Sequence, residues 1–314
     1  MKHAILGVAF AAALAVPAFA QDYTIMAPAN PGGGWDGTAR AMQEVMQAEG
    51  IASSVEVINV PGAGGTVGLA QFVADSAGDP TKLIVGGYVM VGAILTNAAP
   101  VTLKDVTPIA RLTGDTEAIV VPAASDIQTL GDLVEKLKAD PGSVSWAGGS
   151  AGGTDHILVG LLAKAAGVDP TKINYVAYSG GGEAMAAILG NQVTAGVSSV
   201  GEFAEQVNAG TMRLLAVSSA ERLPGIDAPT IKEAGFDVVV ENWRMVAAAP
   251  GLTDEQKAKI AADIEKLNGS AGWATMLEAK GWTNTYLAGD AFAAQLDADI
   301  AATEAVLRDI GLVK

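Results

Sequence analysis

Four glycine-rich stretches contain the residues that could bind a ligand or catalyse a reaction. Each stretch follows an apolar run and precedes a helical pattern. These stretches span residues 31–36, 61–66, 148–154 and 179–182. Glycines let backbone N–H groups point outward at the start of a helix, where unpaired donors and the helix dipole attract an anion. The four stretches therefore predict anion binding. The alternative for any one of them is a tight turn that packs its helix onto a sheet.

The stretch 148–154 also permits nucleophilic catalysis. Gly148-Gly149-Ser150-Ala151-Gly152 matches the G-x-S-x-G pattern of a nucleophile elbow between a strand and a helix. A catalytic triad needs a histidine well downstream, whereas His156 follows within the adjoining helix, where its ring would point about 120° away from Ser150. Ser150 and Thr154 are better interpreted as helix-capping hydroxyls that also donate to a ligand. A secreted serine hydrolase that uses Ser150 stays the alternative hypothesis.

Nucleotide and metal chemistry are not favoured by the sequence. The run 62–68 approaches a dinucleotide-binding fingerprint, but Val67 stands where the last glycine is required, and no Gly-Lys-Ser/Thr phosphate loop occurs. After residue 20, His156 has no second histidine or cysteine with which to complete a transition-metal site. We therefore expect a structural histidine, no metal site and no cofactor.

Two interpretations stay open for each of the charged and aromatic candidates. Asp36 and Asp155 lie in the first turn of a helix, where a carboxylate interacts well with the dipole, and either could also contact a ligand. Arg244 either reaches a bound anion or forms a surface ion pair with Glu241. Trp35 is either a wall of the cleft or a core residue.

The first 20 residues are typical of a secretory signal peptide. They contain Lys2, an apolar run and the small-x-small sequence Ala18-Phe19-Ala20. The apolar run is shorter than the roughly 20 residues that a membrane-spanning helix needs. We therefore predict cleavage before Gln21 and a periplasmic protein. A lipid anchor is excluded because the sequence has no cysteine.

The composition excludes several classes of partner. Among 314 residues, 34 acidic side chains stand against 19 basic ones, for a formal net charge of −15. This excess disfavours nucleic acids and anionic membranes as partners. The length suffices for two ordinary domains.

Alternating apolar strands and helical patterns joined by short loops predict a parallel sheet covered by helices on both faces. Extended segments are expected at 106–112, 118–122 and 238–248. The expected helices include residues 39–46, 67–74, 125–139, 253–267 and 288–310.

The extended segments near Ile119 and Val240 divide the αβ units into two sets. We predict an outer lobe of residues 21–120 and 241–314 and an inner lobe of residues 121–240, joined by two crossing strands with a ligand cleft between them. Ligands of open α/β sheets bind beyond the carboxyl ends of the strands. The glycine-rich stretches, two in each lobe, are therefore expected to face one another.

Taken in order, these motifs resemble the periplasmic substrate-binding proteins of tripartite tricarboxylate transporters. The resemblance rests on Pro31-Gly32-Gly33-Gly34-Trp35-Asp36 and on the runs 61–68, 150–156 and 178–183, and it spans the mature chain. The tryptophan after the glycine triplet, together with Asn242-Trp243-Arg244, is similar to the tricarboxylate-binding branch of the family.

The resemblance implies an α/β type II periplasmic binding protein fold whose two lobes close on a small carboxylate and deliver it to a two-component membrane permease. It implies a monomeric, non-enzymatic receptor without a cofactor. The predicted ligand contacts are Gly33, Gly34, Trp35, Asp36, Gly64 and Thr66 in the outer lobe, Ser150, Thr154, Ser179, Gly180 and Ser199 in the inner lobe, and Arg244 on the second crossing strand. Many family members carry aspartate or asparagine near Ser198-Ser199, so this sequence departs from the family there.

The leading hypothesis is thus an exported solute-binding receptor for a di- or tricarboxylate, with citrate as the first candidate. A citrate–metal complex is an alternative form of the ligand. A secreted structural protein, the third hypothesis, would bind no ligand.

Overall fold

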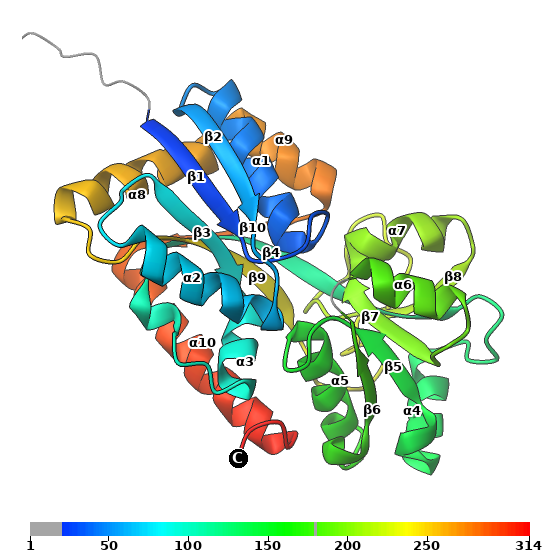
Figure 1. The fold of residues 1–314 in the computed structure, drawn as a ribbon. Coiled ribbons are helices and arrows are strands. Elements are labelled where there is room, and N and C mark those ends of the chain that lie inside the picture. The colour runs from blue at the N-terminus through cyan, green and yellow to red at the C-terminus, as the bar shows by residue number, and fades with distance from the viewer. Residues whose placement is uncertain (1–20, 179–180) are drawn as a thin grey trace, which may run out of the picture.

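The computed structural model describes residues 21–178 and 181–314. The predicted signal peptide (1–20) and two predicted ligand contacts, Ser179 and Gly180, lie outside the described residues. The described elements gather in two bodies, which Figure 1 shows side by side. We call the body that begins at Gln21 the first lobe and the other the second lobe.

The first lobe is built from both ends of the chain. Its strands are β1 (Gln21–Ala27), β2 (Ala52–Asn59), β3 (Lys82–Gly87), β9 (Glu241–Ala248) and β10 (Thr283–Ala288). Its helices are α1 (Gly34–Ala48), α2 (Thr66–Ser76), α3 (Tyr88–Thr96), α8 (Asp254–Gly269), α9 (Ala271–Lys280) and α10 (Gly289–Asp309).

The second lobe is built from the middle of the chain. Its strands are β5 (Ser145–Gly148), β6 (Asn174–Ala177), β7 (Ala195–Ser199) and β8 (Met212–Val217), and its helices are α4 (Leu130–Ala139), α5 (Thr154–Ala165), α6 (Gly181–Leu189) and α7 (Val200–Asn208). Strand β4 (Thr107–Pro122) belongs to both lobes, because it runs from the first into the second.

The strands form a mixed sheet, so the expectation of a purely parallel sheet is wrong. The order is β2-β1-β3-β9-β4-β7-β5-β6, with β8 and β10 also paired to β4. The outer strands pair in parallel, whereas β9 is antiparallel to β3 and β4, and β4 is antiparallel to β7 and β8. The reason is that the chain leaves the first lobe along β4 and returns along β9, so these two strands run in opposite directions.

Strand β4 is a single strand of 16 residues where the sequence suggested two extended segments. Its first part pairs with β9 and β10, and its last part pairs with β7 and β8. Gly114 and Asp115 therefore stay extended because β9 continues beside them. This continuous strand is the main covalent and hydrogen-bonded link between the lobes.

Several helix boundaries differ from the predicted ones for local reasons. Helix α1 begins at Gly34 rather than at residue 39, since the Gly37 N–H already donates to the Gly33 carbonyl oxygen. Helix α4 begins only at Leu130, where Thr129 and Asp132 cap each other's backbone N–H groups in a capping box.

Helix α9 and strand β10 were not predicted. The side chain of Ser270 caps α9 by accepting from the Trp273 N–H, and Gly281 ends it in the left-handed conformation. Strand β10 then pairs with β4 in antiparallel fashion.

Each lobe has its own apolar core. One cluster of buried side chains draws on residues 23–112 and 243–296, with Trp273 and Phe72 among its largest members. Two further clusters draw on residues 118–240, with Trp146 at the centre of one. The two-lobed fold with crossing strands is the type II periplasmic binding protein fold that the sequence predicted.

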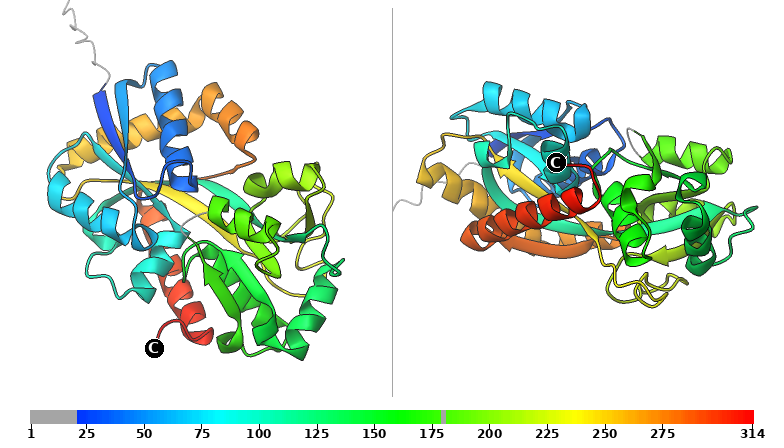
Figure 2. Two further views of the ribbon diagram at one scale, coloured as in Figure 1. Left: turned by 45° about the vertical axis from the view of Figure 1, so that its right-hand side comes forward. Right: turned by 90° about the horizontal axis from the view of Figure 1, so that it is seen from below.

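The lobes also touch beside the crossing strands, where helix α10 runs down to the second lobe (Figure 2). Leu307 of α10 and Ile310, which directly follows this helix, form a small buried cluster with Ile157 of α5. Gly92 of α3 approaches the loop before α5 so closely that a Cβ atom on it would lie 1.9 Å from the Gly152 carbonyl oxygen. The absence of a side chain at Gly92 is therefore a condition of this contact.

Candidate ligand-binding cleft

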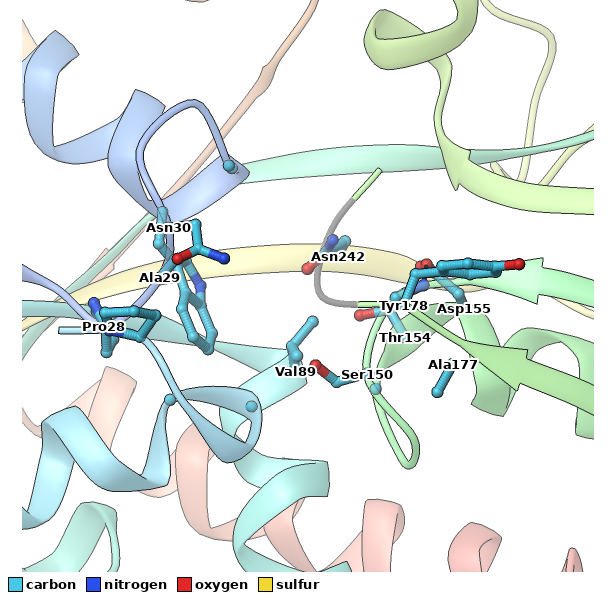
Figure 3. A pocket seen from close by; sticks show the side chains of 18 of the residues that line it. Pro28, Ala29, Asn30, Val89, Ser150, Thr154, Asp155, Ala177, Tyr178 and Asn242 are labelled. Carbon is cyan, nitrogen blue, oxygen red and sulfur yellow. Dashed lines mark hydrogen bonds between the residues drawn. The ribbon is translucent and has the colours of Figure 1, made fainter. Parts of the chain in front are cut away.

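A cavity of about 630 Å³ lies between the lobes. The loops after β1, β2, β5 and β6, which contain the glycine-rich stretches, all contribute to its lining. The main contributors are Pro28, Asn30, Gly33, Gly34, Trp35, Gly64, Gly65, Val89, Gly149, Ser150, Gly153, Thr154, Asp155, Tyr178, Ser198, Ser199, Glu202, Asn242 and Arg244. Figure 3 shows Pro28 and Asn30 on one side and Ser150, Thr154 and Tyr178 on the other, with Asn242 between them.

Four helices begin at this cavity. The residues that precede α1, α2, α5 and α7 are Gly33, Gly65, Gly153 and Ser199, all four line the cavity, and none of these helix starts is capped by a side chain. Ser150 and Thr154 therefore do not cap α5, contrary to the sequence interpretation. Uncapped helix N-termini present N–H donors and the positive end of the dipole to the cavity.

Trp35 fills both of the roles that the sequence left open. Its ring packs against Gly65 so closely that a Cβ atom on Gly65 would lie 2.6 Å from Cζ3. It is 8% exposed, belongs to the first core and also lines the cavity. Gly65, at a φ of +90°, is thus the residue that lets the two first-lobe loops pack together.

Gly64 brings a first-lobe loop toward the second lobe. Its φ is +62°, and a Cβ atom on it would lie 2.5 Å from the Ala93 Cβ and 3.7 Å from the Ser150 Cβ. Only a glycine fits between Ala93 and the cavity in this conformation.

Asp36 does not line the cavity. Its buried carboxylate accepts from the Gly32 N–H at 2.8 Å, from Arg40 Nε at 2.9 Å and from Asn59 Nδ2 at 2.9 Å. Burial opposes ionisation of Asp36, but the hydrogen bonds from Arg40, Gly32 and Asn59 outweigh it and lower the pKa. Asp36 therefore stabilises the first glycine-rich loop from outside the cavity.

Thr66 also stays outside the cavity lining, and its hydroxyl donates to the Ala63 carbonyl oxygen. Among the predicted contacts within the described residues, the cavity therefore brings together Gly33, Gly34, Trp35, Gly64, Ser150, Thr154, Ser199 and Arg244.

Thr154 and Arg244 present polar atoms without a partner. Thr154 Oγ1 is completely buried and makes no hydrogen bond, and the same is true of Arg244 Nη1. A buried polar atom without a partner is costly. Both residues line the cavity, so each is a candidate donor to a ligand.

The predicted surface ion pair of Arg244 with Glu241 is wrong. Arg244 is 3% exposed, its Nη2 donates to Asp115 at 2.9 Å, and its guanidinium carbon lies 4.9 Å from the centre of the Trp282 ring. The reason is the register of β9 on β4, which sets Thr113 opposite Arg244 and leaves Asp115 within reach.

His156 has the structural role expected of it. Its Nδ1 accepts from the Gly152 N–H at 3.3 Å, and its ring stacks on Tyr175 with centroids 4.0 Å apart. Burial lowers the pKa of His156 to about 4, so the imidazole is neutral. With Nδ1 occupied by the loop, this histidine serves to hold Gly152 rather than to activate Ser150.

Three acidic residues, Asp115, Glu117 and Glu202, were missed as part of the site, and Asp155 was considered only as one of two open interpretations. Asp155 and Glu202 line the cavity, and Asp115 and Glu117 lie behind them on β4. Asp115 and Glu117 stand two residues apart, directly before the apolar run 118–122, which is the signal that could have found them.

Within residues 21–178 and 181–314, no three histidine or acidic side chains are arranged to hold a metal ion. In the same part of the chain, no helix has the length and apolar character required to cross a membrane.

Comparison with known proteins gives a consistent result. BugT of Bordetella pertussis is 30% identical over 261 residues, which cover 79% of this chain and 78% of that protein. A TctC solute-binding protein from Polaromonas, solved without ligand, is 25% identical with a TM-score of 0.69 and covers 92% of this chain and 98% of its own.

Two structures with lower sequence identity share the fold. MatC from Rhodopseudomonas palustris with bound malate is 24% identical, with a TM-score of 0.77, and covers 93% of this chain and 100% of its own. An R. palustris protein with adipate is 22% identical, with a TM-score of 0.83, and covers 93% of this chain and 97% of its own.

The model of the tripartite tricarboxylate transporter family receptor matches residues 38–312. Its members are periplasmic solute-binding receptors rather than enzymes, so the alternative of a serine hydrolase built on Ser150 is wrong. By the extent of this match and by its two-lobed fold, the chain belongs to the tripartite tricarboxylate transporter receptor family.

Proposed function

We propose that this receptor captures a small di- or tricarboxylate, with citrate as the first candidate, and delivers it to a two-component membrane permease. The observation that carries the proposal is the convergence of four uncapped helix N-termini, those of α1, α2, α5 and α7, on one cavity. Helix N-termini bind carboxylates through N–H donors and the dipole, without a buried countercharge.

The positions of these helices favour a ligand with two or more carboxylates. Helices α1 and α2 begin on the first-lobe wall, and α5 and α7 begin on the second-lobe wall. A ligand that spans the cavity can thus place one carboxylate against each wall. The malate and adipate of the two distant structures are dicarboxylates, which supports the same class.

We assign the ligand contacts as follows. Ser150, Thr154 and Ser199 donate hydroxyl groups from the second lobe, and Arg244 contributes from β9, where its Nη1 is the donor without a partner. The first lobe contributes backbone at Gly33, Gly34 and Gly64 and the ring of Trp35. Ser179 and Gly180, outside the described residues, stay predicted contacts.

We further propose that the lobes, divided at 120/121 and 240/241, close by bending at β4 and β9. The permease would distinguish the closed, liganded form from the open form. Removal of residues 1–20 as a signal peptide would place a monomeric receptor in the periplasm, in keeping with its family.

A thermal-shift panel tests the proposed ligand class. The protein is purified without refolding and heated with citrate, malate, adipate or the neutral trimethyl ester of citrate. At a concentration of 100 times Kd, a bound carboxylate should stabilise the folded state by about 2.7 kcal/mol, and the ester should give no shift. A panel in which no carboxylate raises the melting temperature would contradict the proposal.

The Ser150→Ala variant tests the assigned contact. Loss of one hydroxyl donor to a carboxylate should weaken binding by about 1.5–3 kcal/mol. Thr66→Ser is the matched control, because it keeps the hydroxyl on a residue outside the cavity lining. Equal affinity in Ser150→Ala and the unmodified protein would remove Ser150 from the site.

A further inference from the structure

The second-lobe wall of the cleft carries acidic side chains, although the cavity is suited to anions. Asp155 of α5 and Glu202 of α7 line the cavity, and Asp115 and Glu117 lie behind them. If all four were ionised, they would repel a carboxylate ligand at short range in a poorly solvated site. Binding of a carboxylate therefore requires that the second-lobe wall lose negative charge.

Glu117 is the member of this group that cannot stay ionised. It is 0% exposed, and its carboxyl oxygens make no hydrogen bond of good geometry. The Asn242 and Asp155 side chains lie close to it, but the effect of Asn242 does not offset the burial. Its own N–H donates to Ser218 Oγ at 2.9 Å, which holds the residue within β4. A buried carboxylate without a donor is strongly disfavoured, and burial accordingly raises the pKa of Glu117 well above its ordinary value. The carboxyl group of Glu117 therefore carries a proton.

Asp155 is the carboxylate whose charge acts most strongly on Glu117. One of its oxygens accepts from the Gly149 N–H at 2.6 Å, which fixes the side chain at the cavity wall. Burial raises the pKa of Asp155 to about 7, and the charge of Glu202 adds to this effect. Near neutral pH the pair of Glu117 and Asp155 thus holds one proton and can accept a second.

The groups that face this pair leave the wall negative. They are Asp115 on β4, His156 on α5, Tyr175 on β6, Glu202 on α7 and Arg244 on β9. The charge of Arg244 is already paired with Asp115. His156 is neutral because burial lowers its pKa to about 4. None of these groups supplies a free positive charge to balance an incoming anion.

We propose that the cleft takes up a proton when it binds its carboxylate ligand, and that Glu117 and Asp155 hold this proton between them. The inference rests on the proposed function and adds a determinant of specificity to it. A carboxylate that reaches Thr154 at the start of α5 lies beside Asp155. Its negative charge favours the neutral form of Asp155, which then becomes a hydrogen-bond donor.

Isothermal titration calorimetry with citrate and malate tests the proposal. Titrations at about pH 7.5 in two buffers of different ionisation enthalpy count the protons taken up, and about half to one proton per bound ligand is expected. Affinity should fall by about tenfold between about pH 7 and pH 8.5, because linkage of one proton permits at most tenfold per pH unit.

The variants Asp155→Asn and Glu117→Gln isolate the pair from the ligand's own ionisation, which is the same for every protein variant. Asp155→Asn should abolish the uptake and flatten the pH dependence, since an amide cannot titrate, whereas Glu117→Gln leaves Asp155 free to titrate and should retain the uptake. Glu117→Gln should also melt at or above the temperature of the unmodified protein at pH 8, because it resembles the protonated side chain. Glu205→Gln, on the exposed face of α7, should retain the full uptake.

Two outcomes would separate this inference from the proposed function. If citrate and malate bind without proton uptake, or if the uptake persists in Asp155→Asn, the proton-linked mechanism is overturned while the receptor function stands. If no carboxylate binds between pH 6 and 8.5, the proposed function itself has failed.

Discussion

Arg244 combines a structural and a binding role in one side chain. Its Nη2 neutralises Asp115, its plane lies over Trp282, and its Nη1 stays without a partner beside the cavity. A Cβ atom at Gly34 would lie 2.8 Å from Nη2, so the start of α1 must be glycine to admit the guanidinium. The arginine therefore couples the first-lobe loop to both crossing strands.

We expect Arg244→Met to lower the free energy of unfolding by about 3–5 kcal/mol, because Asp115 would stay buried without its countercharge. Urea denaturation measures this change. The double variant Arg244→Met/Asp115→Asn should regain most of the stability but not the affinity for citrate. Recovery of citrate affinity in the double variant would contradict a direct role of Nη1.

His156 should make the protein less stable in acid. Its pKa is about 4 when folded, against about 6.5 for an unperturbed histidine, so the unfolded chain binds more protons between these values. The neutral ring contributes about 3 kcal/mol to the free energy of unfolding above pH 6.5, and this contribution is lost as the pH falls through 4.

Asp155 has the opposite effect on stability, since its raised pKa favours the folded state as the pH falls from about 7. To remove the effect of Asp155, the His156→Gln substitution is made in the Asp155→Asn background. Urea denaturation then compares Asp155→Asn with Asp155→Asn/His156→Gln at pH 7 and pH 4.5. The stability difference between the two should shrink at the lower pH. A difference independent of pH would contradict the neutral state of the ring.

At the scale of elements, the decisive feature is where helices begin. Helices α1, α2 and α5 start at glycines that line the cavity, and α7 starts at Ser199. In contrast, α4, α8 and α9 start away from the cavity, and Thr129, Thr253 and Ser270 cap them. Helices α3 and α10 also start without a side-chain cap, so the lack of a cap alone does not mark the site; what distinguishes α1, α2, α5 and α7 is that their uncapped starts line the cavity, where an anion can take the place of the cap.

The contact between α3 and the loop before α5 should control how closely the lobes approach. Gly92→Ala would set a methyl group against the Gly152 carbonyl oxygen, so we expect ligand affinity to weaken by about 1–3 kcal/mol. Calorimetry with citrate measures the change. Gly37→Ala is the matched control, because a Cβ atom there meets nothing within 4 Å, and it should bind as the unmodified protein does. Unchanged affinity in Gly92→Ala would show that this contact does not limit closure.

At the scale of the whole molecule, the cleft exists because one chain builds two cores and crosses between them twice. Residues 107–116 of β4 pair with β9. Beyond them, β4 continues into the second lobe, where it pairs with β7. Bending at this junction can change the width of the cavity without disturbing either core.

We expect saturating citrate to reduce the radius of gyration measured by small-angle X-ray scattering, because the ligand bridges both walls. Ser150→Ala should need more citrate for the same change. Equal scattering curves with and without citrate, at concentrations where calorimetry shows saturation, would contradict closure.

The order of elements and the position of the cleft could be predicted from the sequence because they depend on local signals. Apolar runs, glycine turns and helical periodicity lie within short windows, and the helix predicted at residues 67–74 lies within α2 (Thr66–Ser76). Helix α9 could also have been found, since Ser270 and Gly281 are ordinary start and stop signals.

The sequence by itself predicted that glycine-rich turns before helices would face one cleft, and Ser150, Thr154 and Arg244, which it named, do line the cavity. Only the tertiary structure decided which carboxylates belong to the site. Asp36 turns away to Arg40 and Asn59, whereas Asp115 and Glu117 are brought from β4 to Asp155. The physical reason is that burial and the partners of a charge come from strand register and lobe packing, which join residues far apart in the chain.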